Sequence, residues 1–159
     1  MECFFATEAN QAVPPVYADA EAANEPFKLK DDNRQRKQTT ILARMGQQRF
    51  RFQVLKKYGA KCAVCEISHP QLLKAAHIRG KYHHGSDDWR NGIVLCSTHH
   101  DAYDSLLFGI EPQTLSLRTN PKVSAQQIGI QHVSLQTLKN RPHDDALRWR
   151  WAETVKDWA

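Results

Sequence analysis

The sequence has no long apolar run, and it lacks the features of an exported chain. No stretch is long and apolar enough to span a membrane. The first residues, MECFFATEANQAVPPVYADA, contain neither the basic segment nor the apolar core of a secretory signal. Internal repeats are absent as well, which excludes a repeat array. We therefore expect a cytoplasmic protein with no membrane partner.

Basic residues are missing from the first part of the chain. Residues 1–27 contain five acidic residues and neither Lys nor Arg, and we expect residues 1–30 to form a flexible acidic leader. Residues 28–61 reverse this balance, with eleven Lys and Arg against two Asp, in a chain of net charge +5. Such a concentration of positive charge attracts polyanions, of which nucleic acid is the commonest, although a solvated helix face has the same composition.

Cysteine is scarce and unevenly placed. Cys3 stands alone, whereas Cys62, Cys65 and Cys96 are accompanied by histidine. In a cytosolic chain this favours a metal site over a disulfide, and no thioredoxin-like pattern surrounds the Cys62–Cys65 pair. The length of 159 residues suits one ordinary domain, which we divide into a basic helix with its core at 31–120 and a C-terminal extension at 121–159.

Periodicity and turn residues predict an α+β fold. The expected elements are a helix at 31–58 that Gly46 divides in two, strands at 72–78 and 91–96 with a loop between them, a helix at 95–104 capped by Ser97 or Thr98, a strand or hairpin at 108–120, and a final helix at 144–158. The apolar stripe of the first helix should contain Met45, Leu55 and Tyr58, that of the last helix Leu147, Trp151, Val155 and Trp158, and Phe50 and Phe52 should lie in the core.

Two short motifs have the spacing of zinc ligands. Cys62-Ala-Val-Cys65 and Cys96-Ser-Thr-His99 are separated by thirty residues. Two such turns can close a tetrahedral site of three thiolates and one imidazole, which would fasten two distant segments of a small domain. Cys96 and His99 stand three residues apart at a helix start, where both side chains can face one ion. His69 is a less favoured alternative to His99 as the fourth ligand.

The next residue, His100, cannot serve the same site, because neighbouring helical residues point about 100° apart. Asp104 follows it on the same helix face, four residues on. His77, Asn91 and His100 together have the spacing H-x13-N-x8-H.

This spacing resembles the HNH nuclease family, whose ββα-metal core consists of two antiparallel strands and a helix around one divalent cation. The stretch GQQRFRFQVLKKYGAKCAVC…LLKAAHI…NGIVLCSTHHDAYD is similar to a zinc-stapled branch that is associated with restriction and other prokaryotic DNA-cleaving proteins. The resemblance covers about residues 44–117. It implies an endonuclease that hydrolyses DNA, with a role in restriction or defence.

The resemblance also implies site residues. His77 would be the general base that activates water, for which an imidazole of ordinary pKa is suited. Asn91 would tie down the loop and orient that base. His100 and Asp104 would hold a divalent cation, either Mg²⁺ or another ion such as Mn²⁺ or Ni²⁺, that stabilises the phosphate. Structural zinc would be bound by Cys62, Cys65, Cys96 and His99.

The sequence departs from the family pattern at two positions. Many members have Asp or His before the base histidine, where this chain has Ala76; the missing cation ligand is then water or one of the loop residues His84, Asp87 and Asp88. The fourth zinc ligand is more often Cys than His. A swapped assignment, with His100 on zinc and His99 catalytic, is disfavoured because only His100 has a carboxylate four residues on.

Basic residues on the first helix and around the loop are the expected DNA contacts, since phosphate contacts supply salt-dependent affinity. They are Arg44, Arg49, Arg51, Lys56, Lys57, Arg79, Lys81 and Arg90. Tryptophans of the last helix suit packing or a contact between copies, which leaves a homodimer open. The alternative to a nuclease is a zinc module that binds DNA or protein without catalysis. The trio His77, Asn91 and His100 favours the nuclease, because a pure binding module has no use for it.

Overall fold

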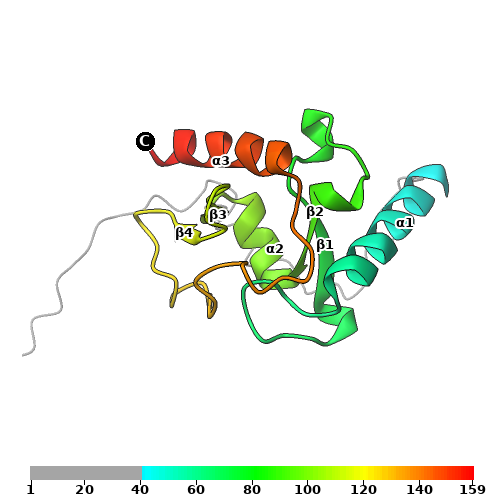
Figure 1. Ribbon diagram of the computed structural model, residues 1–159, viewed down its shortest axis with the longest axis horizontal. Helices are drawn as coiled ribbons and strands as arrows, with labels where there is room; N and C mark the ends of the chain where they lie inside the picture. Colours follow the sequence, from blue (N-terminus) through cyan, green and yellow to red (C-terminus); the bar gives the residue numbers. More distant parts are fainter. Residues whose placement is uncertain (1–40) are drawn as a thin grey trace, which may run out of the picture. The chain divides into compact units, whose positions relative to one another are not determined.

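The structure is a computed structural model that describes residues 41–159 (Figure 1). These residues fall within one compact unit, Thr39–Ala159. The elements, in chain order, are helix α1 (Ile41–Tyr58), strands β1 (Leu73–His77) and β2 (Gly92–Cys96), helix α2 (Ser97–Asp104), strands β3 (Phe108–Ile110) and β4 (Leu117–Thr119), and helix α3 (Asp144–Trp158). The architecture is α+β, as predicted.

Helix α1 is continuous through Gly46, so the predicted break at this residue is wrong. Phe50, Val54 and Tyr58 recur every four residues and are buried, which makes them the face that packs on the core. The predicted stripe was therefore partly wrong: Met45 is 60% exposed and Phe52 is 65% exposed, because both lie on the side turned away from the sheet. The part of the predicted helix at 31–40 lies outside the described residues.

Strands β1 and β2 form an antiparallel hairpin in which Leu73 pairs with Cys96 and His77 pairs with Gly92. All residues of β2 are buried, because α1 packs against the hairpin from one side and α2 from the other (Figure 1). A Cβ atom at Gly92 would lie 2.6 Å from Val54 and 2.8 Å from the ring of Phe50. Glycine at this position therefore allows α1 to approach the end of the hairpin.

Helix α2 follows β2 without a loop. Cys96 occupies the N-cap position and makes no capping hydrogen bond with its side chain. The predicted cap by Ser97 or Thr98 is thus wrong: the helix begins one residue earlier than the cap required, and the Ser97 hydroxyl donates to the carbonyl of Leu72 instead. This direct connection places the whole of α2 across the hairpin, with Ala102 and Tyr103 buried.

The rest of the chain packs on the outside of this ββα unit. Strands β3 and β4 form a short antiparallel hairpin, and α3 lies against β3. The Trp158 indole nitrogen donates to the carbonyl of Leu106, which fixes the end of α3. Leu147 and Thr154 are fully buried, whereas Val155 is 38% exposed. Of the predicted stripe, Leu147, Trp151 and Trp158 pack on the fold and only Val155 does not, since the Trp151 ring lies beside Gly109 and contacts Trp158. Thr154 joins the buried face because it returns its hydroxyl to the carbonyl of Arg150.

Within residues 41–159, no helix combines the length and the apolar character that crossing a membrane requires.

Candidate metal centre and active site

Four buried side chains from two distant segments converge beside the hairpin. Cys62, Cys65, Cys96 and His99 each offer one ligand atom, and these atoms all lie within 4.8 Å of one another. Nδ1 of His99 lies 3.0 Å from Sγ of Cys96 and 3.6 Å from Sγ of Cys62. The three cysteines are free thiols. The structure thus brings together the four residues that the two spaced motifs predict, while His69 remains outside the cluster.

The chemistry of this cluster fits a metal ion. Burial, followed by the neighbouring thiols of Cys62 and Cys96, raises the pKa of the Cys65 thiol to about 12. Three thiols packed this closely become thiolates only if a cation compensates their charge, and thiolate with imidazole is the donor set that Zn²⁺ prefers. All four residues are buried, as is usual for a structural site with four protein ligands.

The ring of His99 is held in the orientation of a ligand. Its Nε2 lies 2.9 Å from the carbonyl oxygen of Ile128, to which it donates when Nδ1 carries the metal. The segment at 125–132 also pairs with the turn between Cys62 and Cys65, called the knuckle below, since the amide of Gln131 donates to the carbonyl of Val64. The chain beyond β4 therefore covers the cluster and fixes one of its ligands, a role that the spacing of the cysteines did not indicate.

His100 faces away from this cluster. Its Nδ1 lies 3.2 Å from Oδ2 of Asp104, on the same face of α2. This nitrogen is buried and has no well-oriented hydrogen-bond partner within residues 41–159. A carboxylate oxygen and an orphaned imidazole nitrogen at this separation suit a shared cation, because two ligands at right angles about 2.1 Å from Mg²⁺ lie roughly 3 Å apart. The two neighbouring histidine rings thus lie in different surroundings, one in the Cys/His cluster and one beside the carboxylate of Asp104.

His77 ends β1, and its ring contacts two side chains, Asp87 and Phe50. Nε2 lies 2.9 Å from Oδ1 of Asp87, and the ring stacks on Phe50 at 3.8 Å with an interplanar angle of 6°. Burial lowers the pKa of His77, against the opposing effect of Asp87, and the positive charge of Lys81 lowers it further. The ring of His77 is therefore mainly neutral at pH 7.

Asn91 closes the loop between β1 and β2. Its side chain is buried, and its Oδ1 accepts from the amide of Arg79 while its Nδ2 donates to the carbonyls of Arg79 and Ser86. Gly85 lets the middle of the loop approach the backbone of Arg79 closely, since a Cβ at this position would lie 1.7 Å from the carbonyl oxygen of Arg79. These contacts join the end of the loop at Asn91, and its middle at Gly85 and Ser86, to Arg79 at its start, close to His77.

The basic residues of this loop already have partners within the molecule. Arg79 donates to the carbonyl of His83 and stacks over the ring of Trp149. Lys81 lies 2.7 Å from Oδ2 of Asp87.

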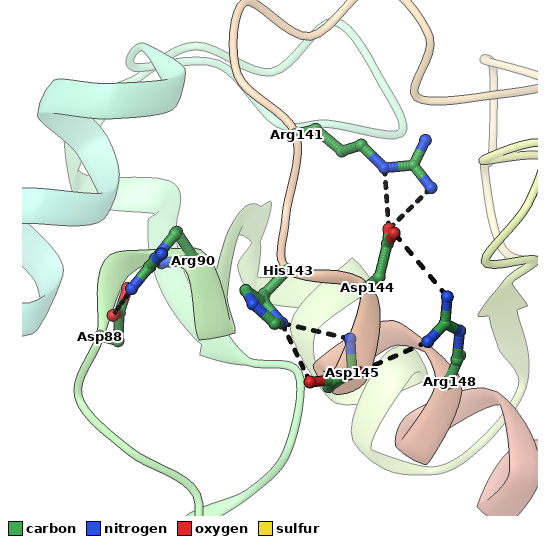
Figure 2. Close-up of polar contacts among 7 residues, drawn as sticks. All are labelled: Asp88, Arg90, Arg141, His143, Asp144, Asp145 and Arg148. Atoms are coloured by element: carbon green, nitrogen blue, oxygen red, sulfur yellow. Dashed lines mark hydrogen bonds and ion pairs between the residues drawn. The ribbon is translucent and has the colours of Figure 1, made fainter.

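Arg90 makes a paired contact with Asp88, whose pKa its guanidinium lowers to about 2, and Figure 2 shows this pair facing the acidic first turn of α3. The other paired charges in that view include Arg141 with Asp144. A cleft of about 320 Å³ lies between this turn and the loop. The loop cations therefore organise the site before they meet any substrate.

The basic residues of α1 divide into two groups. Arg51 donates to the carbonyls of Pro70 and Leu73, so it joins α1 to the start of β1. Arg49, Lys56 and Lys57 are exposed, and the latter two lie near the rings of Phe52 and Trp89. Arg44 belongs to the first turn of α1, where the side chains are outside the described part of the chain.

Two residues of the site were not assigned their positions by sequence reasoning. Asp87 entered only as one of three candidates for a cation ligand, and Phe50 only as a core residue, yet both contact the ring of His77. Ala76 is fully buried in the core. The contacts of His77 with Asp87, and of Asp87 with Lys81, could not be predicted from residue spacing, because these two residues lie in a loop and not on a helix or strand.

Residues 62–111 match the family model described as HNH endonuclease. No curated protein matches the chain. The matched segment begins at Cys62 and extends just beyond β3, so it contains the whole ββα unit and the Cys/His cluster. The resemblance inferred from the H-x13-N-x8-H spacing is thereby confirmed for this segment. A domain of this family implies nuclease activity and a nucleic-acid substrate.

Proposed function

We propose that the protein is a metal-dependent DNA endonuclease in which His77 activates the attacking water. One observation carries the proposal: His77 ends β1, α2 packs across the β1–β2 hairpin, and His100 on α2 lies beside Asp104, outside the buried Cys/His cluster. A ββα unit stapled by one metal site thus presents two imidazoles that the staple does not use. A phosphodiester hydrolase needs such a pair, one to take a proton and one to bind a cation.

His77 has the protonation state of a general base. Because burial lowers its pKa, the ring is neutral at pH 7 and can accept a proton from water. Phe50 and Asp87 restrict the ring to one orientation, so its free edge is presented in a fixed direction. Asn91 supports this arrangement from behind, because its three hydrogen bonds hold the loop that supplies Asp87.

His100 and Asp104 are the residues that would hold the cation. When bound, a hard divalent ion such as Mg²⁺, Mn²⁺ or Ni²⁺ would stabilise charge on the phosphate and on the departing oxygen. In residues 41–159, the Cys62 cluster is the only group of three or more potential ligand side chains that meet at one point. Two protein ligands leave several positions for water and for phosphate oxygens, as is usual for Mg²⁺.

Exposed basic side chains of α1 would bind the DNA backbone. Arg49, Lys56 and Lys57 fit this role because they are exposed, whereas Arg51 is already joined to β1. Arg79, Lys81 and Arg90 would contact DNA only in addition to their internal partners. The similarity to prokaryotic DNA-cleaving proteins supports a restriction or defence role.

A plasmid-nicking assay with the zinc-loaded protein and Mg²⁺, Mn²⁺ or Ni²⁺ tests the proposal. We expect the wild type to cleave, and His77→Ala to fold, retain zinc and lose roughly 10²–10⁴-fold of the rate, the usual contribution of a general base. A wild type that binds plasmid without cutting it with any of these ions would favour the non-catalytic zinc module. Undiminished cleavage by His77→Ala would remove this residue from the mechanism.

A further inference from the structure

Two charged side chains, Asp87 and Lys81, form a chain of polar contacts that ends at His77, and no sequence motif marks it. Oδ1 of Asp87 lies 2.9 Å from Nε2 of His77, and Oδ2 of the same carboxylate lies 2.7 Å from Nζ of Lys81. The side chain of His77 is only 16% exposed, whereas that of Asp87 is 42% exposed. The carboxylate thus reaches from the surface of the loop to a nearly buried ring.

The carboxylate is ionised, which determines the direction of the hydrogen bond. Partial burial raises the pKa of Asp87, but the hydrogen bonds from Lys81 and His77 outweigh this effect and hold it below its usual range. An ionised carboxylate only accepts hydrogen bonds, so Nε2 of His77 must carry a proton. In a neutral imidazole the other nitrogen, Nδ1, then has the free lone pair.

The rest of the ring has no competing contact. Phe50 stacks parallel to one face and offers no hydrogen bond. Within residues 41–159, the bond to Asp87 is the only hydrogen bond that the His77 ring makes. Nδ1 is therefore the one position of the ring at which a water molecule can be activated.

We propose that Asp87 is a positioning residue, which fixes the Nε2–H tautomer of His77 and so directs Nδ1 at the attacking water, while Lys81 holds the carboxylate in place. The role in catalysis rests on the proposed function, whereas the tautomer itself does not. Asp87 has no direct contact with the attacking water or the phosphate in this proposal. It acts only through the ring of His77, as an orienting carboxylate does for a catalytic histidine.

The protein offers a matched control at a distance from this site. Glu66 also bridges a lysine and a histidine, with 2.8 Å to Nζ of Lys61 and 2.7 Å to Nε2 of His132. Asp87→Ala and Glu66→Ala therefore remove the same kind of bridge, one at His77 and one at the knuckle. The zinc content and melting temperature of both variants establish that each is folded before they are compared.

Two measurements on the zinc-loaded full chain test the proposal. The ¹⁵N resonances of the His77 ring show which nitrogen is protonated, and single-turnover plasmid cleavage with Mg²⁺ or Mn²⁺ gives the rate. We expect the Nε2–H tautomer in the wild type and in Glu66→Ala, and a mixture of tautomers in Asp87→Ala. Cleavage by Asp87→Ala should fall about 10–100-fold at saturating cation, part of what a general base contributes, and Asp87→Glu should recover part of the rate.

Three results would overturn the proposal. An unchanged tautomer in Asp87→Ala would show that the carboxylate does not set it. Faster cleavage by Asp87→Ala would mean that Asp87 blocks the ring instead of orienting it. A loss that disappears at high Mn²⁺ concentration would make Asp87 a cation ligand. A wild type that does not cleave sinks the proposed function, yet the ring resonances still decide whether Asp87 fixes the tautomer.

Discussion

His99 and His100 show how one residue of separation on a helix assigns two identical side chains to different tasks. Nδ1 of His99 lies against the thiols of Cys62 and Cys96, while Nδ1 of His100 lies 3.2 Å from the carboxylate of Asp104. The two rings diverge because successive residues are rotated by about 100° around α2. Loss of one ring should therefore leave the function of the other intact.

We expect His99→Ala and His100→Ala to fail in different ways. Removing His99 opens the zinc cluster, which should release zinc and lower the melting temperature strongly, since structural zinc supplies roughly 10 kcal/mol or more in small zinc domains. Removing His100 should leave one equivalent of zinc and a near-native melting temperature but reduce cleavage. Zinc analysis, thermal unfolding and nicking of the same preparations check this. Loss of zinc from His100→Ala would reverse the two assignments.

The lowered pKa of His77 predicts how cleavage depends on pH. A general base must be unprotonated, and burial keeps the pKa of His77 below its ordinary value of 6.5. The rate should therefore fall as the pH is lowered through the depressed pKa of His77, with a midpoint below 6.5. Single-turnover rates from about pH 5 to 8 at saturating cation measure this acid limb. A midpoint above 6.5 would contradict a neutral, desolvated ring.

At the scale of elements, the loop between β1 and β2 determines whether the site is assembled. It carries Asp87 and Lys81, and it is closed by Asn91 and by the close approach of Gly85 to Arg79. Ile78 and Trp89 anchor the two ends of the loop to the core, whereas Tyr82 between them is 91% exposed, so the polar and steric constraints help to define the shape of this middle part. Changes here should affect activity more than the stability of the whole fold.

Gly85→Ala tests this dependence. A methyl group 1.7 Å from a carbonyl oxygen cannot be accommodated, so the loop must open there. We expect a loss of about 1–3 kcal/mol of unfolding free energy together with a much larger relative loss of cleavage, while zinc stays bound. Gly80→Ala is the control, because a Cβ at Gly80 meets no atom within 4 Å. Equal effects of the two substitutions would show that the tight approach at Gly85 is unimportant.

Sequence patterns predicted most elements here but missed the buried face of α1 and misplaced one residue, Val155, on α3. The hairpin, α2, and the bounds of α3 follow from β-branched runs and from amphipathic spacing. The face of α1 does not, because the apolar residues Met45 and Phe52 compete with Phe50 and Val54 for the same periodicity, and only packing against Gly92 selects the second pair. The zinc ligands were predictable because their spacing is local; the partner of His77 was not, because a loop supplies it.

At the scale of the whole molecule, positive charge has two separate uses. Arg51 and the loop cations are bonded within the fold, whereas the exposed residues of α1 have no such task. The net charge alone cannot distinguish these two groups, since each Lys or Arg adds one positive charge to the total whether or not it is bonded within the fold. Their effects on DNA binding should differ.

We expect Arg49→Ala and Lys56→Ala each to make the dependence of log K on log salt less steep by about 0.9, the effect of losing one phosphate contact. Arg118→Ala on β4 is the control, since its side chain is also exposed but pairs with Glu111. Fluorescence anisotropy with a short duplex at several salt concentrations measures the slopes. The same slope in all three variants would remove α1 from the DNA interface.

Phe50 has a consequence for the smallest piece of this chain that could work alone. Its ring fills the space above Gly92 and at the same time stacks on His77, so α1 forms one wall of the site. The family match begins at Cys62, after α1 has ended. A fragment trimmed to the matched segment would keep its zinc ligands and its polar trio but lose the surface against which the imidazole rests. A fragment that is meant to retain the complete site must therefore begin before the matched segment and include α1.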